Sequence, residues 1–160
     1  MEFTHIDDKG NVRMVDVSEK EVTHRTATAV GRIRMSEACF RAVEEGRVKK
    51  GDVLTAAQVA GIMGLKRTAD LIPLCHTLAI TKAEVTFRLL PEEWAVEACC
   101  TVCCDGKTGV EMEALTGCAT ALLTIYDMCK ALDKTMVMDN IHLAAKSGGK
   151  SGDYLFEEQA

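Results

Sequence analysis

Two neighbouring runs of alternating residues, 78–90 and 94–104, constrain the fold most strongly. In the first run, apolar residues such as Val85 alternate with charged ones such as Glu84, which is the pattern of a half-buried strand. The second run is equally rich in residues that favour strands. A short proline-containing turn, 91–93, separates the two. The pair therefore predicts a β-hairpin.

Helical patterns lie on both sides of this hairpin. Residues 36–46 and 51–64 predict two short helices, and Ser36 and Asp52 are suited to cap their N-termini. Residues 110–132 predict a longer helix, because apolar side chains recur there at helical spacing. The expected buried stripe of that helix consists of Val110, Ala114, Cys118, Leu122, Ile125 and Cys129.

Strands predicted at 22–35 and 140–147 complete the order β-α-α-β-β-α-β. This order predicts an α+β protein of ferredoxin-like type, with an antiparallel sheet and helices packed on one face. The 160 residues are one domain long, so we expect a single domain over 1–160. Its ends, 1–15 and 147–160, are expected to be flexible. The other sheet face would need a cover, which favours an oligomer.

Four of the eight cysteines fall in CCTVCC, residues 99–104. In a strand, Cys100 and Cys104 share one face, and Cys99 and Cys103 share the other. Buried free thiols are the favoured interpretation, because cysteine behaves as a small core hydrophobe. A metal site built on the C-x-x-C spacing is the alternative.

Net charge and hydropathy limit the partners. The chain carries a formal charge of −5, which argues against general affinity for nucleic acid. No apolar run approaches the roughly 18–20 residues that span a bilayer. The N-terminus lacks the pattern of a signal peptide, so we expect a cytoplasmic protein without a membrane partner. Local clusters of lysine and arginine favour a small anionic ligand.

The segment KSGGKSGD, residues 146–153, resembles a phosphate-binding loop. It is not the G-x-x-x-x-G-K-[ST] loop, because Ala144 stands where the first glycine belongs and no helix follows. Glycines can still turn backbone N–H groups toward an anion beside Lys146 and Lys150. A solvated tail is the alternative.

The long helix carries two groups of charged residues. Asp127 and Lys130 are neighbours on the helix surface and form either an exposed ion pair or an acid/base pair. Glu111 and Glu113 stand at its N-terminus, where negative charge is stabilising. Glu113 and Asp127 are about 21 Å apart along the axis at 1.5 Å per residue. If both act on one substrate, helices from two subunits must supply them.

One polar arc is also expected on this helix. Its members are Glu113, Thr116, Thr120, Thr124 and Asp127. They fall opposite much of the apolar stripe at about 100° per residue.

His76 follows Pro73 in a predicted loop and is either a structural or a functional histidine.

Five motifs in order, KKGDV, AGIMGLKRTADLIPLCH, GKTGVEMEALTG, LTIYDMCKA and AKSGGKSGD, resemble the cyclic pyranopterin monophosphate synthase family, the molybdenum cofactor biosynthesis protein C family. The resemblance covers nearly the whole chain. It implies a lyase that converts 3′,8-cyclo-7,8-dihydroguanosine triphosphate to cyclic pyranopterin monophosphate and releases diphosphate. It also implies a homohexamer, a trimer of dimers, with active sites at the dimer interface.

The resemblance further implies roles for individual residues. By motif, Asp127 is the catalytic general acid/base, with Lys130 beside it. The implied substrate-binding residues are Leu74, Cys75, His76, Met112, Glu113, Glu111, Lys50, Lys146 and Arg25. Thr77 departs from the family pattern, which continues there with proline. The reaction requires no redox cofactor and no protein metal site, although Mg²⁺ can accompany the triphosphate. A non-catalytic anion-binding regulator is the alternative, and it would not need Asp127 and Lys130.

Overall fold

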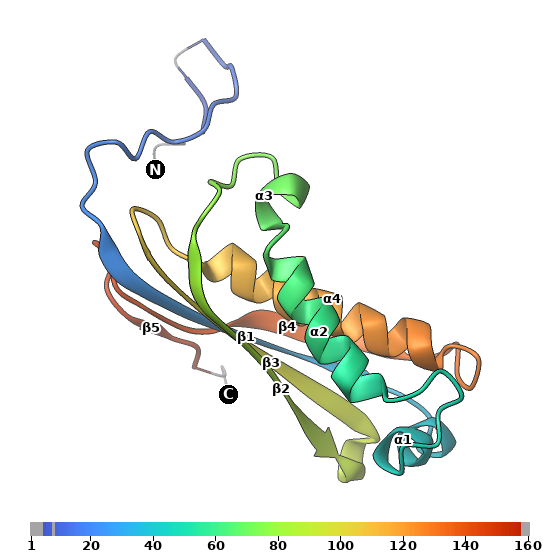
Figure 1. The fold of residues 1–160 in the computed structure, drawn as a ribbon. Coiled ribbons are helices and arrows are strands. Elements are labelled where there is room, and N and C mark those ends of the chain that lie inside the picture. The colour runs from blue at the N-terminus through green and yellow to red at the C-terminus, as the bar shows by residue number, and fades with distance from the viewer. Residues whose placement is uncertain (1–4, 8, 158–160) are drawn as a thin grey trace.

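The computed structural model describes residues 5–7 and 9–157. Its centre is an antiparallel sheet with the strand order β2-β3-β1-β4-β5 (Figure 1). The strands are β1 (Thr23–Arg34), β2 (Ile80–Leu90), β3 (Ala95–Gly106), β4 (Val137–Ser147) and β5 (Tyr154–Leu155). A 3₁₀ turn, η1 (Pro91–Glu93), joins β2 to β3, so the predicted hairpin is confirmed.

The α-helices are α1 (Glu37–Glu44), α2 (Val53–Leu65), α3 (Thr68–Leu71) and α4 (Glu111–Cys129). Of these, α2 and α4 cover one face of the sheet (Figure 1). α2 and α4 pack side by side, and α4 also contacts β1, β3 and β4. The succession β1-α2-β2-β3-α4-β4 with this strand order is the ferredoxin-like arrangement, which confirms the predicted fold class.

Local capping explains where the short helices begin. The Ser36 hydroxyl accepts a hydrogen bond from the Cys39 N–H at 3.4 Å, and the Asp52 carboxylate accepts one from the Thr55 N–H at 3.0 Å. Each bond satisfies an N–H that the first turn leaves free. The long helix ends at Cys129, three residues earlier than predicted, because the chain turns there and Leu132 donates its N–H to the Cys129 carbonyl.

The long helix buries its predicted apolar stripe completely, since each of its six members is at most 1% exposed. The polar arc differs from the prediction. Glu113 is buried and the threonines are half-buried, because this side of α4 packs against α2. A β-carbon built on Gly64 of α2 would lie 2.8 Å from the Thr120 β-carbon. The arc is therefore largely an interhelical contact rather than an open face.

The cysteine-rich strand alternates as predicted. Cys100 and Cys104 are buried under the helices, whereas Cys99 and Cys103 are half-buried on the opposite face. All eight cysteines are free thiols. Burial raises the pKa of Cys100 to about 12, so this thiol stays protonated and packs as an apolar group.

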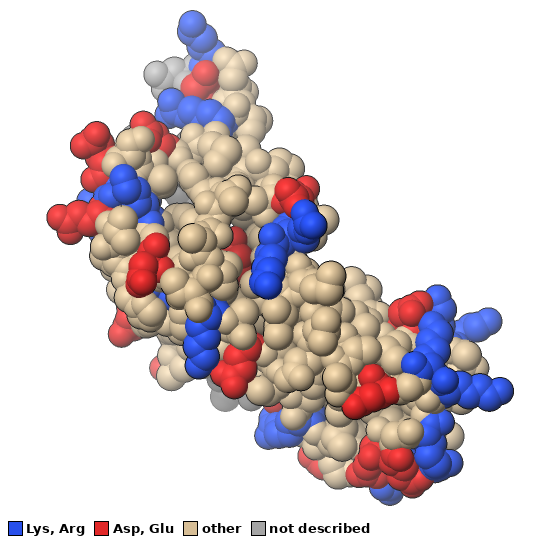
Figure 2. Space-filling view, viewed as in Figure 1, with Lys and Arg blue, Asp and Glu red and all other residues tan. Residues whose placement is uncertain are grey.

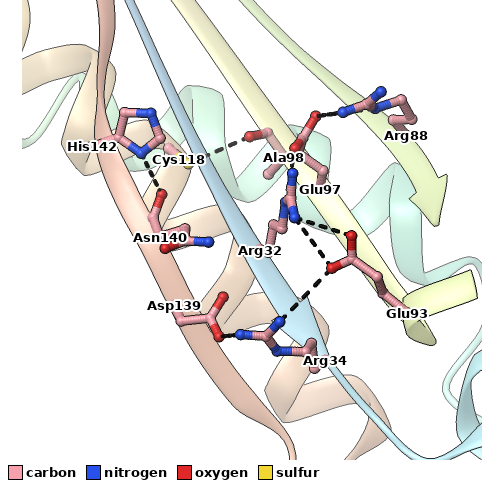
Figure 3. Close-up of polar contacts among 10 residues, drawn as sticks. All are labelled: Arg32, Arg34, Arg88, Glu93, Glu97, Ala98, Cys118, Asp139, Asn140 and His142. Carbon is pink, nitrogen blue, oxygen red and sulfur yellow. Dashed lines mark hydrogen bonds and ion pairs between the residues drawn. The ribbon is translucent and has the colours of Figure 1, made fainter. Parts of the chain in front are cut away.

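The sheet face away from the helices carries a network of ion pairs (Figure 3). Arg32 donates its Nε–H to Glu97 at 3.0 Å and its Nη1–H to Glu93 at 3.1 Å. Arg88 donates to the other oxygen of Glu97 at 2.7 Å, and Arg34 pairs with Asp139. Arginines and carboxylates thus pair with one another across four strands, β1 to β4. Whether a further subunit covers this face stays a prediction.

Asp133 joins the start of α1 to the turn after α4. Its carboxylate accepts hydrogen bonds from the Ser36 N–H and from the N–H and hydroxyl of Thr135, each at 2.7 Å. The side chain is buried. The Thr135 hydroxyl and then the Ser36 N–H lower the pKa of Asp133 to about 2, because all of these bonds favour the ionised carboxylate.

We expect Asp133→Asn to lower the free energy of unfolding by about 2 kcal/mol at pH 7, as measured by urea denaturation. Because the folded-state pKa is depressed, this stabilisation is complete above the unfolded-state pKa of 3.8. It is lost as the pH falls toward 2, so the two proteins should converge in acid. Asp70→Asn, which removes half of an exposed ion pair, should change stability by less than ~0.5 kcal/mol. If the free energies of unfolding of wild type and Asp133→Asn differed as much in acid as at pH 7, this role of Asp133 would be contradicted.

The expected flexibility of 1–15 and 147–160 falls in part on residues outside the described ranges and stays a prediction. Within the described part, Tyr154–Leu155 pairs with β4.

No helix in residues 5–7 and 9–157 has both the length and the apolar character that crossing a membrane requires.

Candidate active site

A cavity of about 340 Å³ lies beside the N-terminus of α4. Pro73 ends the preceding helical segment, and the loop after it delivers one wall. The first turn of α4 delivers the facing wall. Six predicted residues line this cavity: Leu74, Cys75, His76, Glu111, Met112 and Glu113. The structure therefore brings together residues that are more than thirty positions apart in the chain.

Glu113 is the buried acid of this cavity, with 5% of its surface exposed. Burial raises the pKa of its carboxyl, and the negative charge of Glu111 adds to the effect. Burial likewise raises the pKa of the neighbouring Cys75 thiol, with a contribution from Glu113. The cavity therefore holds a carboxyl that is easier to protonate than an exposed glutamate, which suits proton transfer.

The N-terminal segment forms the remaining wall. His76 places its Nε2 2.9 Å from the Val15 carbonyl oxygen, which joins the loop after α3 to this segment. The segment contributes His5, Val15, Val17 and Lys20 to the lining. Sequence reasoning missed these residues, because a contact across 61 positions leaves no local pattern.

A second, larger cavity of about 760 Å³ adjoins the first. Lys20, Thr108, Gly109 and Glu111 line both. The further cations of the second cavity are Arg25, Lys107, Lys146 and Lys150. Four lysines and an arginine around one hollow favour an anionic ligand, although Glu19, Glu21 and Glu111 offset part of the charge. Sequence reasoning singled out Arg25 and Lys146 but missed Lys20 and Lys107.

The glycine loop borders this second cavity. Lys146 pairs with Glu111 at 3.1 Å and donates to the Ser151 hydroxyl at 2.8 Å. Lys107 donates to the Ser18 carbonyl at 2.6 Å. The contacts of Lys146 hold the loop after β4 beside the first turn of α4. The predicted phosphate-binding character of KSGGKSGD is consistent with this position.

A separate cluster lies at the other end of α4. The Asp127 carboxylate contacts Lys130 Nζ at 2.8 Å and Lys50 Nζ at 2.9 Å, and Lys50 also donates to the Asp127 carbonyl. The hydrogen bonds from Lys130 and then Lys50 lower the pKa of Asp127 to about 2. In return, Asp127 raises the pKa of Lys130. At neutral pH the cluster is one carboxylate between two ammonium groups.

The structure thus separates the predicted site residues into two groups. One surrounds the paired cavities, and the other, formed by Lys50, Asp127 and Lys130, occupies the opposite end of the same helix. The fourteen-residue separation of Glu113 and Asp127 corresponds to about 21 Å. Within one subunit, a single small substrate cannot contact both groups.

Comparison with known proteins identifies the family of the chain. The model of the MoaC family matches residues 14–149, which include every predicted site residue. The chain belongs to the MoaC family. Three similar relatives each carry the name cyclic pyranopterin monophosphate synthase. They come from Clostridium botulinum (57% identical, over 97% of this chain and 98% of the relative), Heliobacterium modesticaldum (56%, over 98% of both) and Chloroflexus aurantiacus (56%, over 96% and 94%).

The structure also bears on the two alternatives that the sequence left open. The metal-protein alternative built on CCTVCC gains no support, because no three potential metal ligands gather in residues 5–7 and 9–157. A non-catalytic anion-binding regulator would also use the cationic cavity. That alternative gives no reason for the clustering of Asp127 with two lysines.

Proposed function

We propose that this protein is a cyclic pyranopterin monophosphate synthase, a lyase of molybdenum cofactor biosynthesis. Its substrate is 3′,8-cyclo-7,8-dihydroguanosine triphosphate and its products are cyclic pyranopterin monophosphate and diphosphate. The observation that carries this proposal is the pair of adjoining cavities, one holding a buried carboxyl and the other lined by cations. Their chemistry suits a substrate with a heterocyclic end and a triphosphate end.

The second cavity is the proposed triphosphate site. Arg25 and Lys146 bind phosphate oxygens there, with Lys20 and Lys107 as additional cations. Positive charge at this position stabilises the negative charge of the departing diphosphate. The guanine-derived rings then lie in the first cavity against Leu74, Cys75, His76, Met112 and Glu113, and the Glu113 carboxyl exchanges protons with them.

The Asp127 cluster supplies the proposed proton-transfer groups. Lys130 and Lys50 lower the pKa of Asp127 to about 2, so Asp127 is ionised at neutral pH. It is therefore in the form that can accept a proton, although the two lysines make it a weak base. Lys130 is protonated, since Asp127 raises its pKa, and it serves as the donor. Lys50 holds Asp127 from the other side. The ring rearrangement needs both a proton acceptor and a proton donor.

Two subunits complete the proposed site. An isologous dimer that places two α4 helices antiparallel brings Asp127 of one copy to the cavities of the other. The helix layer offers a suitable surface, because Val59 and Met63 on α2 and Leu123 on α4 are more than half exposed. Figure 2 shows a largely uncharged area between two charged ends. We place this dimer in a homohexamer, a trimer of dimers.

The proposed reaction needs no redox cofactor, because ring opening, ring rebuilding and cyclic phosphate formation are proton and phosphoryl transfers. Mg²⁺ enters only as a companion of the triphosphate. The proposed substrate derives from GTP. A cytoplasmic location remains our expectation from the sequence.

Incubation of the purified protein with the cyclised dihydroguanosine triphosphate tests the proposal. We expect stoichiometric release of diphosphate and formation of the pyranopterin, detected by a coupled diphosphate assay and by fluorescence after oxidation. Tight binding without turnover would instead support the anion-binding regulator. Glu84→Gln, which changes an exposed charge on β2, should leave turnover unchanged.

A further inference from the structure

Gly149 lies directly against the guanidinium of Arg25. A β-carbon built on Gly149 would overlap Arg25 Nη1 and lie 2.6 Å from Arg25 Cζ. Gly149 also has a φ of +80°, which a residue with a side chain adopts with strain. The backbone of the glycine loop therefore covers the guanidinium, and any side chain at this position must displace it.

Arg25 is confined from other directions as well. It lies on β1 opposite Cys104 of β3, and a β-carbon on Gly148 would lie 3.5 Å from its Cδ. Its Nε is buried and has no hydrogen-bond partner among residues 5–7 and 9–157. Nor does any ion pair within those ranges involve Arg25. A confined arginine with an unused donor, lining a cationic cavity, is suited to bind an anion.

We infer that Gly149 is a positioning residue, which sets the Arg25 guanidinium for a phosphate group of the substrate. This inference rests on the proposed function for the identity of the ligand. Arginine binds phosphate through a planar fork of N–H groups, so a small displacement of the fork breaks paired hydrogen bonds. The atom that blocks a side chain at Gly149 is the flexible end of Arg25. A substitution therefore moves the guanidinium rather than the sheet.

Binding of inorganic tripolyphosphate, measured by titration calorimetry, tests the inference. We expect Gly149→Ala to raise the Kd about 10- to 100-fold, the range of a lost charge-assisted hydrogen bond. Gly152→Ala is the matched control, because Gly152 also has a positive φ of +67° but has nothing within 4 Å of a built β-carbon. It shares the backbone strain without touching Arg25, and we expect a change below about threefold.

Combination with Arg25→Ala identifies the route of the effect. If Gly149 acts through Arg25, Gly149→Ala should raise the Kd less than about twofold in the Arg25→Ala background. A full effect in that background would overturn the inference, as would equal effects of Gly149→Ala and Gly152→Ala. Failure of the wild-type protein to bind tripolyphosphate would overturn it too. Loss of turnover with the binding pattern intact would instead contradict the proposed function alone.

Discussion

Asp127→Asn should reduce the rate of diphosphate release by about 1,000-fold, which is within the range of general acid–base catalysis. Asparagine preserves the shape of the side chain but removes the charge that holds Lys50 and Lys130 at 2.9 and 2.8 Å. It also removes the proton acceptor. Single-turnover kinetics with the cyclised substrate measure the chemical step directly.

The control for this variant is Asp70→Asn. Asp70 also forms an exposed ion pair three residues along a helix, with Arg67 at 3.3 Å, but it lies outside both groups of site residues. It should change the rate less than about twofold. Equal turnover of wild type and Asp127→Asn, with circular dichroism and oligomer size unchanged, would reduce the Asp127 cluster to a surface ion-pair network.

Mixing two inactive variants should restore activity if the site is shared. In a dimer of Asp127→Asn with Glu113→Gln, one site carries both substitutions and the other carries neither. Random assortment makes half of the dimers mixed, so about one quarter of wild-type activity should return. Co-expression with two affinity tags provides the mixed oligomers, and the diphosphate assay measures their rate.

The matched control mixes Asp127→Asn with Lys130→Met. Both substitutions lie in the same cluster at the end of α4, so every site of every mixed dimer retains one of them. This pair should stay inactive. Rescue of the control pair, or failure of the first pair, would contradict a site built from Asp127 of one copy and Glu113 of another.

The elements that follow a strict period could be predicted from the sequence. Alternation on β2 and β3 and the apolar stripe of α4 identified the hairpin and the buried helix face, because burial on one face leaves a regular pattern. The exit from α4 was predicted three residues late. Asp133, in the turn after α4, accepts a long-range hydrogen bond from the Ser36 N–H, and no local pattern in the sequence reports such a bond.

The site was less accessible to pattern analysis. The Asp127–Lys130 pair follows from helical spacing, and the separation of Glu113 from Asp127 follows from helix length. In contrast, the approach of Lys50 to Asp127 joins positions 77 residues apart, and only the resemblance to a known family indicated Lys50. The wall formed by Val15 and Lys20 was missed entirely, since its contacts with the loop after α3 are nonlocal.

The central position of β1 has a consequence for folding during synthesis. β1 is made first, but its hydrogen-bonded neighbours come much later. Thr28 contacts Thr101, 73 positions away, and Arg34 contacts Asp139, 105 positions away. Sheet formation must therefore wait until most of the chain has left the ribosome, and nonlocal pairing of this kind slows folding. Until then the inner face of β1, which carries Ala27, Ala29 and Ile33, has none of the cover that buries it in the folded protein, and exposed apolar surface of this kind favours aggregation.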